Sequence, residues 1–116
     1  MFYLNVVLIW LALILGVSGA WASSLFPNKS VKMLYINFCA ECHGRKGHGT
    51  EEGPDLRNND AIKKSNADKI IGQIKKGIQN TNSRYLGKYK EGMPASENLT
   101  DEETKTLAGL LKKWNP

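Results

Sequence analysis

Two cysteines and a histidine lie together in the segment Cys39-Ala40-Glu41-Cys42-His43. Thiols three positions apart can each form a thioether with one vinyl group of the same porphyrin. The histidine that follows the second thiol is then held beneath the ring, where an imidazole nitrogen can ligate the iron. The spacing is that of a c-type haem attachment site. It predicts one covalent haem c, bound through Cys39 and Cys42, with His43 as an axial ligand.

Three other chemistries compete for these residues. A CxxC pair can be a thioredoxin-like redox site, although that site belongs beside a βαβ pattern, which the sequence lacks. A zinc site formed by Cys39, Cys42, His43 and His48 would crowd four ligands into ten residues, and no second cysteine pair follows. The two thiols could also form a simple disulfide in an exported protein, but the adjacent histidine favours haem.

An iron that only transfers electrons usually has a second axial ligand, and two methionines beyond the leader can offer a thioether, Met33 and Met93. Met93 lies far along the chain and can cross the other ring face, and Pro94 biases it toward extended backbone. Met33 lies on the attachment helix, on the same side as the cysteines, and is expected to fill the core. His48 is a weaker alternative, because it would have to reach around the porphyrin edge. We therefore predict His43 and Met93 as the iron ligands.

Helical periodicity indicates the elements that must position these ligands. Apolar residues recur at spacings of three and four in three segments, about Val31–Cys39, Ala67–Lys76 and Asp101–Trp114. Asn66 and Gly77 are placed to begin and end the second segment. Thr100 and Glu103 form a capping-box pair at the start of the third. No stretch alternates apolar and polar residues for long enough to indicate a strand, so the sequence predicts an all-α domain.

Two long segments without periodicity, residues 43–60 and 78–99, separate the predicted helices. The first is polar and rich in glycine. Structureless loops of this length are unusual inside a small helical domain. They are therefore expected to wrap the cofactor.

The leader, residues 1–22, carries no charged side chain. Its apolar run Val6–Val17 and the sequence Ala20-Trp21-Ala22 fit a signal peptide with its cleavage site. No Lys or Arg precedes the run, so an uncleaved membrane anchor competes with this interpretation. Both interpretations place residues 23–116 outside the cytoplasm, as one monohaem domain that is periplasmic or otherwise exported.

All 16 Lys and Arg and all 11 Asp and Glu residues follow the leader, so the net charge of +5 belongs to the domain. The basic residues near the haem-bearing segments are Arg45, Lys46, Arg57, Lys63, Lys64, Lys88 and Lys90. Such charges would steer the domain toward redox partners with acidic docking surfaces, unless they form an ordinary solvated surface with the interspersed carboxylates. The scattered basic residues and the predicted export argue against a nucleic-acid partner. An uncleaved leader would add association with the membrane.

The sequence resembles class I cytochrome c, of the small exported bacterial kind, over about residues 29–114. The resemblance rests on CAECH, on Gly53-Pro54-Asp55-Leu56, on Gly92-Met93-Pro94 and on a C-terminal helix ending Leu-Leu-Lys-Lys. It implies three main helices and two long loops wrapped around one covalently attached haem. It also implies that the carbonyl of Pro54 orients His43 and that Leu56 lines the haem pocket. The first and last helices would cross, which would bring Tyr35 and Phe38 near Leu107, Leu110 and Leu111.

Two positions depart from the family pattern. Many members have glycine eight positions before the first cysteine, where the helices approach, but Val31 stands there. Gly109 in the last helix is expected to supply that space, in which case Gly109→Leu would overpack the crossing. The chain also lacks the mid-chain tryptophan that bonds a haem propionate in some members. Arg57, Tyr85 or Tyr89 could replace it.

With both axial positions filled, the iron has no open site for a substrate. The predicted function is therefore single-electron transfer between exported or membrane redox partners, without enzymatic activity. The alternative is a cytochrome c subunit held permanently in a larger oxidoreductase complex. A ligand-binding or peroxidase-type haem protein would need an open iron, and therefore a Met93 that does not bind.

Overall fold

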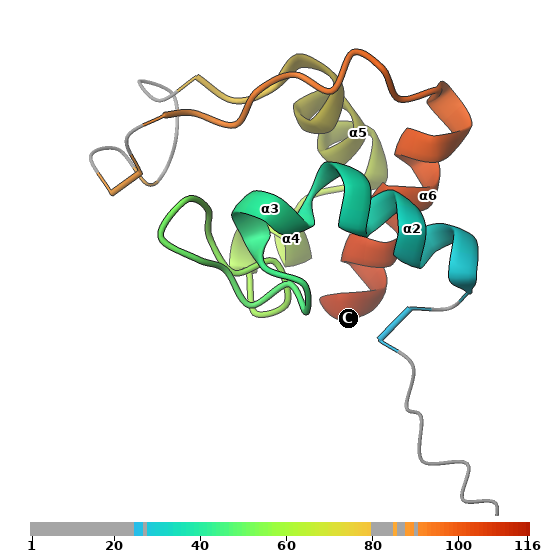
Figure 1. The fold of residues 1–116 in the computed structure, drawn as a ribbon, viewed down its shortest axis with the longest axis horizontal. Helices are drawn as coiled ribbons and strands as arrows, with labels where there is room; N and C mark the ends of the chain where they lie inside the picture. The colour runs from blue at the N-terminus through green and yellow to red at the C-terminus, as the bar shows by residue number, and fades with distance from the viewer. Residues whose placement is uncertain (1–24, 27, 80–84, 86–87, 90) are drawn as a thin grey trace, which may run out of the picture.

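The computed structural model describes residues 25–26, 28–79, 85, 88–89 and 91–116, and the predicted leader lies outside them. Within these residues the chain forms helices and no strand, which confirms the all-α prediction (Figure 1). The helices are α2 (Lys29–Phe38), α3 (Ala40–His43), α4 (Asp60–Lys64), α5 (Ala67–Lys76) and α6 (Asp101–Trp114). No helix in this part of the chain combines the length and apolar character needed to cross a bilayer.

Local capping sets the ends of the longer helices. The Asn66 side chain accepts from the N–H of Lys69 at the start of α5, and Gly77 ends that helix with φ 74°. Thr100 and Glu103 form the predicted capping box of α6. The bounds predicted for α5 and α6 are confirmed, because side-chain caps and a glycine stop are readable from sequence alone.

Two short helices, α3 and α4, were not predicted, and one end of α4 is stabilised by a contact from a distant part of the chain. Asn59 caps the start of α4 by accepting from two backbone N–H groups. At the other end of α4, the Lys112 ammonium group donates to the carbonyls of Lys63 and Ser65, each at 3.0 Å. A cation on the last carbonyls of a helix compensates its dipole, and this one comes from the C-terminal helix.

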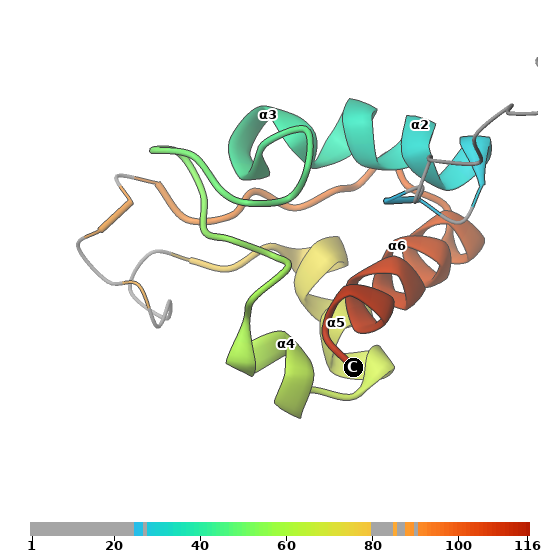
Figure 2. The ribbon, with the colours of Figure 1, turned by 90° about the horizontal axis from the view of Figure 1, so that it is seen from below.

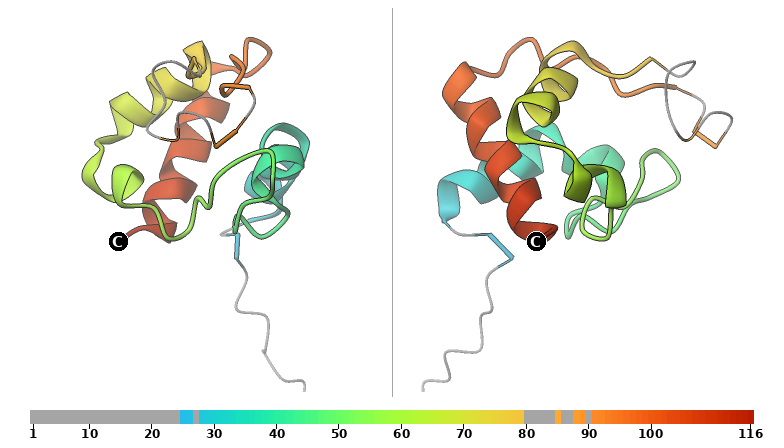
Figure 3. Two further views of the ribbon diagram at one scale, coloured as in Figure 1. Left: turned by 90° about the vertical axis from the view of Figure 1, so that its left-hand side faces the viewer. Right: turned by 180° about the vertical axis from the view of Figure 1, so that it is seen from behind.

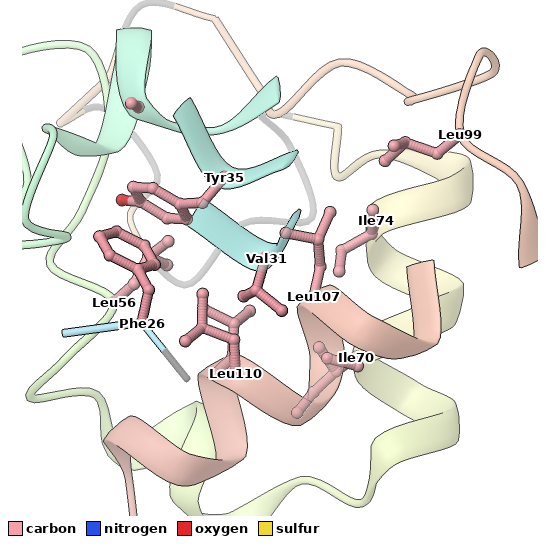
Figure 4. Close-up of a cluster of buried hydrophobic side chains, with 12 residues drawn as sticks. Phe26, Val31, Tyr35, Leu56, Ile70, Ile74, Leu99, Leu107 and Leu110 are labelled. Carbon is pink, nitrogen blue, oxygen red and sulfur yellow. The ribbon is translucent and has the colours of Figure 1, made fainter. Parts of the chain in front are cut away.

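Helix α6 is the centre of the domain and packs against α2, α4 and α5 (Figure 2). The buried apolar side chains form one cluster between these helices (Figure 4). Tyr35 and Leu107 are among its most deeply buried members. The predicted contact between the first and last helices is therefore confirmed. The segments leaving α5 and entering α6 run side by side and are joined by an antiparallel bridge between Ile78 and Met93 (Figure 3).

Two apolar side chains of α2 are not in this core. Met33 is 48% exposed, so the prediction that it fills the core is wrong. Phe38 is 43% exposed and lies outside the buried core, but it lines a cavity together with Leu107 and Leu111. The face of α2 turned toward α6 is centred on Val31 and Tyr35, and Met33 lies outside that face because successive helical residues are about 100° apart.

The expected close approach at Gly109 is also wrong. A Cβ atom added to Gly109 would meet nothing within 4 Å, and the residue is exposed on α6. Val31 is accommodated in the core itself, where it is 3% exposed. The crossing of α2 and α6 therefore does not depend on a glycine at position 109.

We expect Gly109→Ala to stabilise the protein by about 0.5–1 kcal/mol, because alanine loses less backbone entropy in a helix interior and has open space here. Thermal unfolding measures the gain. Gly47→Ala is the contrasting variant, since Gly47 has φ 79° and its Cβ would lie 2.6 Å from the Trp114 ring. A lower melting temperature for Gly109→Ala would contradict the placement of this residue.

Candidate functional site

A cavity of about 370 Å³ opens between α2, α3, α5, α6 and the segment around Met93. Its lining includes every residue predicted to hold the cofactor: Cys39, Cys42, His43, Pro54, Leu56 and Met93. It does not include the competing ligands Met33 and His48. The fold therefore brings together residues from the two ends of the domain in one site.

His43 is held in one orientation by its second ring nitrogen. The ring is buried, and its Nδ1–H donates to the Pro54 carbonyl over 2.8 Å, the contact that the family resemblance implies. A carbonyl can only accept, so this bond fixes the tautomer and leaves the lone pair on Nε2. Burial lowers the pKa of His43, and the bond to Pro54 partly opposes that effect. A neutral imidazole with a fixed tautomer is the form that ligates a metal.

Glycine permits the loop to approach His43 this closely. A Cβ on Gly53 would lie 2.9 Å from the Cys42 carbonyl oxygen and 3.1 Å from His43 Nδ1. The loop is tied to α3 by the Gly49 N–H, which donates to the His43 carbonyl over 2.8 Å. The Tyr35 hydroxyl donates to the Gly44 carbonyl at the end of α3. The glycine-rich segment is therefore a fixed support for the imidazole.

Asp55 stabilises the turn that follows Pro54. Its Oδ1 accepts from the N–H groups of Arg57 at 2.7 Å and Asn58 at 3.1 Å. Burial acts to raise the pKa of Asp55, but these two N–H groups and His48 outweigh it and lower the pKa. The ionised carboxylate is therefore the form that the folded turn favours.

We expect Asp55→Ala to lower stability by about 1 kcal/mol at neutral pH, because two backbone donors lose their acceptor. A lowered pKa contributes stability above the ordinary carboxyl pKa, about 4, and that contribution is lost as the pH falls through the folded-state value. The two proteins should therefore converge in strong acid. Asp55→Asn, which keeps the acceptor oxygen, is the control. A variant difference independent of pH would contradict this role.

The two thiols differ in their surroundings. Burial, and then the neighbouring Cys42, raises the pKa of Cys39 to about 12. Burial also raises the pKa of Cys42, with added effects from the charges of Glu41, Glu52 and Glu91. Both cysteines are free thiols in the structure. No group of three or more His, Cys, Asp or Glu within the described ranges is placed to hold a metal ion.

The backbone of Met93 is paired with that of Ile78, which follows the end of α5. The Ile78 N–H donates to the Met93 carbonyl over 2.8 Å. Gly77 lies so close to this segment that a Cβ there would clash with the Met93 carbonyl oxygen. Gly77 thus has two functions, since it ends α5 and admits the segment that carries Met93 to the cavity.

Two of the three residues suggested for a propionate line the cavity. Tyr85 and Tyr89 both do so, with ring centroids 5.6 Å apart. The Arg57 guanidinium instead lies over the Trp114 ring, 5.4 Å from its centroid. Arg57 therefore makes a cation–π contact at the end of α6 and does not line the cavity.

Much of the rest of the lining is apolar and carries no site signal in the sequence. It includes Phe38, Ile62, Ile70, Ile74, Leu107 and Leu111. Most of these residues belong to the apolar faces of helices, where a core position and a cofactor contact have the same sequence signal. Two thiols, a neutral imidazole and a thioether around an apolar cavity are donors that fit a covalently bound haem.

Comparison with known proteins agrees with this chemistry. Residues 29–114 match the Cytochrome c family, and no curated protein matches the chain. Members of this family bind haem c, are typically exported and usually carry electrons, and family membership implies haem-based electron transfer here. The matched range contains the attachment motif, the Pro54 loop and Met93. The chain belongs to the cytochrome c family.

Proposed function

We propose that this protein is a single-electron carrier whose one haem c is held by Cys39 and Cys42 and ligated by His43 and Met93. The observation that supports this most strongly is the His43 imidazole, which is buried, oriented by Pro54 and placed in the same cavity as Met93. An iron with both axial positions filled has no site for a substrate. The proposed activity is therefore electron transfer in which no covalent bond of a substrate is made or broken.

Bound haem would supply an iron that gains and loses one electron. His43 would offer Nε2, and Met93 its thioether sulfur, a soft ligand that favours the reduced metal. The apolar lining would exclude water and disfavour the extra charge of the oxidised state. Both effects raise the reduction potential relative to an exposed or bis-histidine haem.

An optical redox titration of the purified exported protein tests this function. We expect one reversible one-electron transition, a charge-transfer band from sulfur to ferric iron, and no binding of carbon monoxide to the reduced protein. Carbon monoxide binding without denaturant would contradict Met93 ligation and indicate a ligand-binding or peroxidase-type protein. A partner that persists through purification would instead indicate a subunit of a larger complex.

We also propose that the domain is exported to the periplasm by a cleaved signal peptide, residues 1–22. The family's typical export and the apolar, uncharged leader support this proposal. Sequencing the N-terminus of the mature protein tests it directly. A mature chain that begins at Ser23 is the expected result, and one that retains the leader would indicate an anchor.

We further propose that basic residues at the cavity steer the protein to acidic redox partners. The exposed Lys69 lines the cavity, and the Lys88 ammonium lies 5.5 Å from the ring centroid of Tyr89, which also lines it. Glu52 and Glu91 are exposed in the same lining, so the proposal rests on the net charge of +5 and on these two lysines, and not on a uniformly basic rim. Lys90 lies outside the described residues, and Lys69 was missed because its position in α5 gives no such signal. Positive charge beside the edge of the proposed haem would raise the rate of association with anionic partners. This increase in rate would be smaller at high salt, which screens the charges.

We expect Lys88→Glu to slow oxidation of the reduced protein by hexacyanoferrate(III) several-fold at low salt, since this anion is repelled by the new charge. The difference should shrink as ionic strength rises. Lys32→Glu is the matched control, because Lys32 is an exposed lysine of α2 that does not line the cavity. Equal slowing by the two variants would show an effect of net charge alone.

A further inference from the structure

Two buried amides join the C-terminal end of the chain to the cavity. Asn59 is 8% exposed and Asn115 is 6% exposed. The Asn115 Oδ1 accepts from the Asn59 N–H over 2.9 Å. The Asn115 Nδ2 donates to the carbonyls of Leu56 and Leu111, each over 2.8 Å. Asn115 thereby ties the cavity segment that contains Leu56 to the end of α6.

The Asn59 side chain faces two ways. Its Oδ1 caps α4 by accepting from the N–H groups of Ala61 and Ile62. Its Nδ2 donates to the Asp55 carbonyl over 2.8 Å and to the Tyr85 hydroxyl over 3.2 Å. Asn59 and Tyr85 both line the cavity. The oxygen therefore stabilises a helix, while the nitrogen holds a phenol hydroxyl at the proposed haem site.

The cap alone does not require this arrangement. Serine or aspartate would cap α4 equally well, and neither would donate to Tyr85 in the same way. Burying two primary amides is costly unless all their polar atoms are bonded. No buried side-chain nitrogen or oxygen in the described part of the chain lacks a hydrogen-bond partner, so hydrogen bonds offset the cost of desolvating the two amides. Capping and burial therefore do not account for the hydrogen bond that the Asn59 Nδ2 donates to the Tyr85 hydroxyl.

We infer that Asn115 and Asn59 form a hydrogen-bond relay that positions the Tyr85 hydroxyl in the cavity wall and thereby helps to set the reduction potential. This inference rests on the proposed haem-based function. An oriented dipole in a site of low dielectric acts on the charge of a nearby metal, and it costs nothing to reorient when that charge changes. Asn59 and Asn115 are positioning residues, because they act through Tyr85.

A double-mutant cycle on the holo-protein tests the relay, with the midpoint potential and the melting temperature as readouts. Asn59→Ser keeps an oxygen for the α4 cap and removes the donor to Tyr85. Tyr85→Phe removes the hydroxyl. We expect each single variant to shift the reduced-to-oxidised ratio at a fixed potential by about two- to fivefold in the same direction. The double variant should shift it no further, because the Asn59–Tyr85 bond is the interaction that both changes remove. The bond from Asn59 to the Asp55 carbonyl is lost only in Asn59→Ser, and its loss should appear in the melting temperature.

Asn115→Leu extends the test to the far end of the relay. It should shift the potential in the wild-type background and leave it unmoved in the Tyr85→Phe background, while lowering the melting temperature in both. Tyr89→Phe is the matched control, since Tyr89 lines the cavity beside Tyr85. The Asn59→Ser shift should be unchanged in the Tyr89→Phe background.

Two results would overturn the relay. One is an Asn59→Ser variant with a lower melting temperature and an unchanged potential, which would indicate a purely structural cap. The other is additive shifts in the double variant. In either case a normal haem spectrum in all proteins would leave the proposed function intact. Wild-type protein without haem would instead contradict the proposed function itself.

Discussion

Met93→Ala should lower the reduction potential by on the order of 0.1 V or more and open the iron to carbon monoxide. Loss of the thioether removes a soft ligand that favours ferrous iron and admits water to the metal. Axial ligands are among the strongest determinants of haem potential, so the expected change is large. Redox titration and carbon monoxide binding to the reduced protein measure the two effects.

Met33→Ala is the matched control for this variant. Met33 is 48% exposed on α2 and does not line the cavity, so its removal should change neither the potential nor carbon monoxide binding. A Met93→Ala variant that keeps the wild-type potential would contradict Met93 as ligand. A large shift of the reduction potential in Met33→Ala would mean that Met33, and not Met93, ligates the iron.

Replacing both thiols, Cys39→Ala with Cys42→Ala, should abolish covalent haem and leave the chain largely unfolded. Without the cofactor, the apolar side chains that line the cavity have no packing partner and face water. Domains are only marginally stable, so this loss is large on the scale of the whole stability. A chain this short has little additional core with which to compensate. We expect far-UV circular dichroism of the purified variant to show little helix and no cooperative melting.

The single variant Cys42→Ala separates attachment from folding, because it keeps one thiol for the ring and keeps both axial ligands. It should retain helical structure and melt at a lower temperature than the wild type. Cooperative unfolding of the haem-free double variant would show that the protein core is sufficient without the cofactor.

The parts of the fold encoded locally could be predicted from sequence. The ends of α5 and α6 follow from Asn66, Gly77 and the Thr100–Glu103 capping box, which act within a few residues. By contrast, Lys112 reaches the end of α4 from a distant helix, and no local pattern predicts that contact, whereas the Asn59 cap at the start of α4 is local. The same limitation explains Met33, since periodicity identifies an apolar residue but not the neighbour it meets.

The candidate site shows the same division. The attachment motif and Met93 are short chemical patterns, and the structure places them at one cavity. The hydrogen bond from His43 to Pro54 was available only through the family resemblance. The hydrogen bond between Asn59 and Asn115 could not be predicted, because it joins residues far apart in the chain. Asn59 before Asp60 is a local N-cap signal, but it says nothing of this partner. Buried polar pairs of this kind can be found only once the fold is known.

The central claim is that a haem is covalently attached at Cys39 and Cys42, and intact mass combined with acid extraction tests it most directly. The purified protein should have the mass of its polypeptide plus one haem, and its colour should stay with the protein in acidified organic solvent. A colourless protein with the mass of the bare chain, or pigment released into the solvent, would contradict the claim.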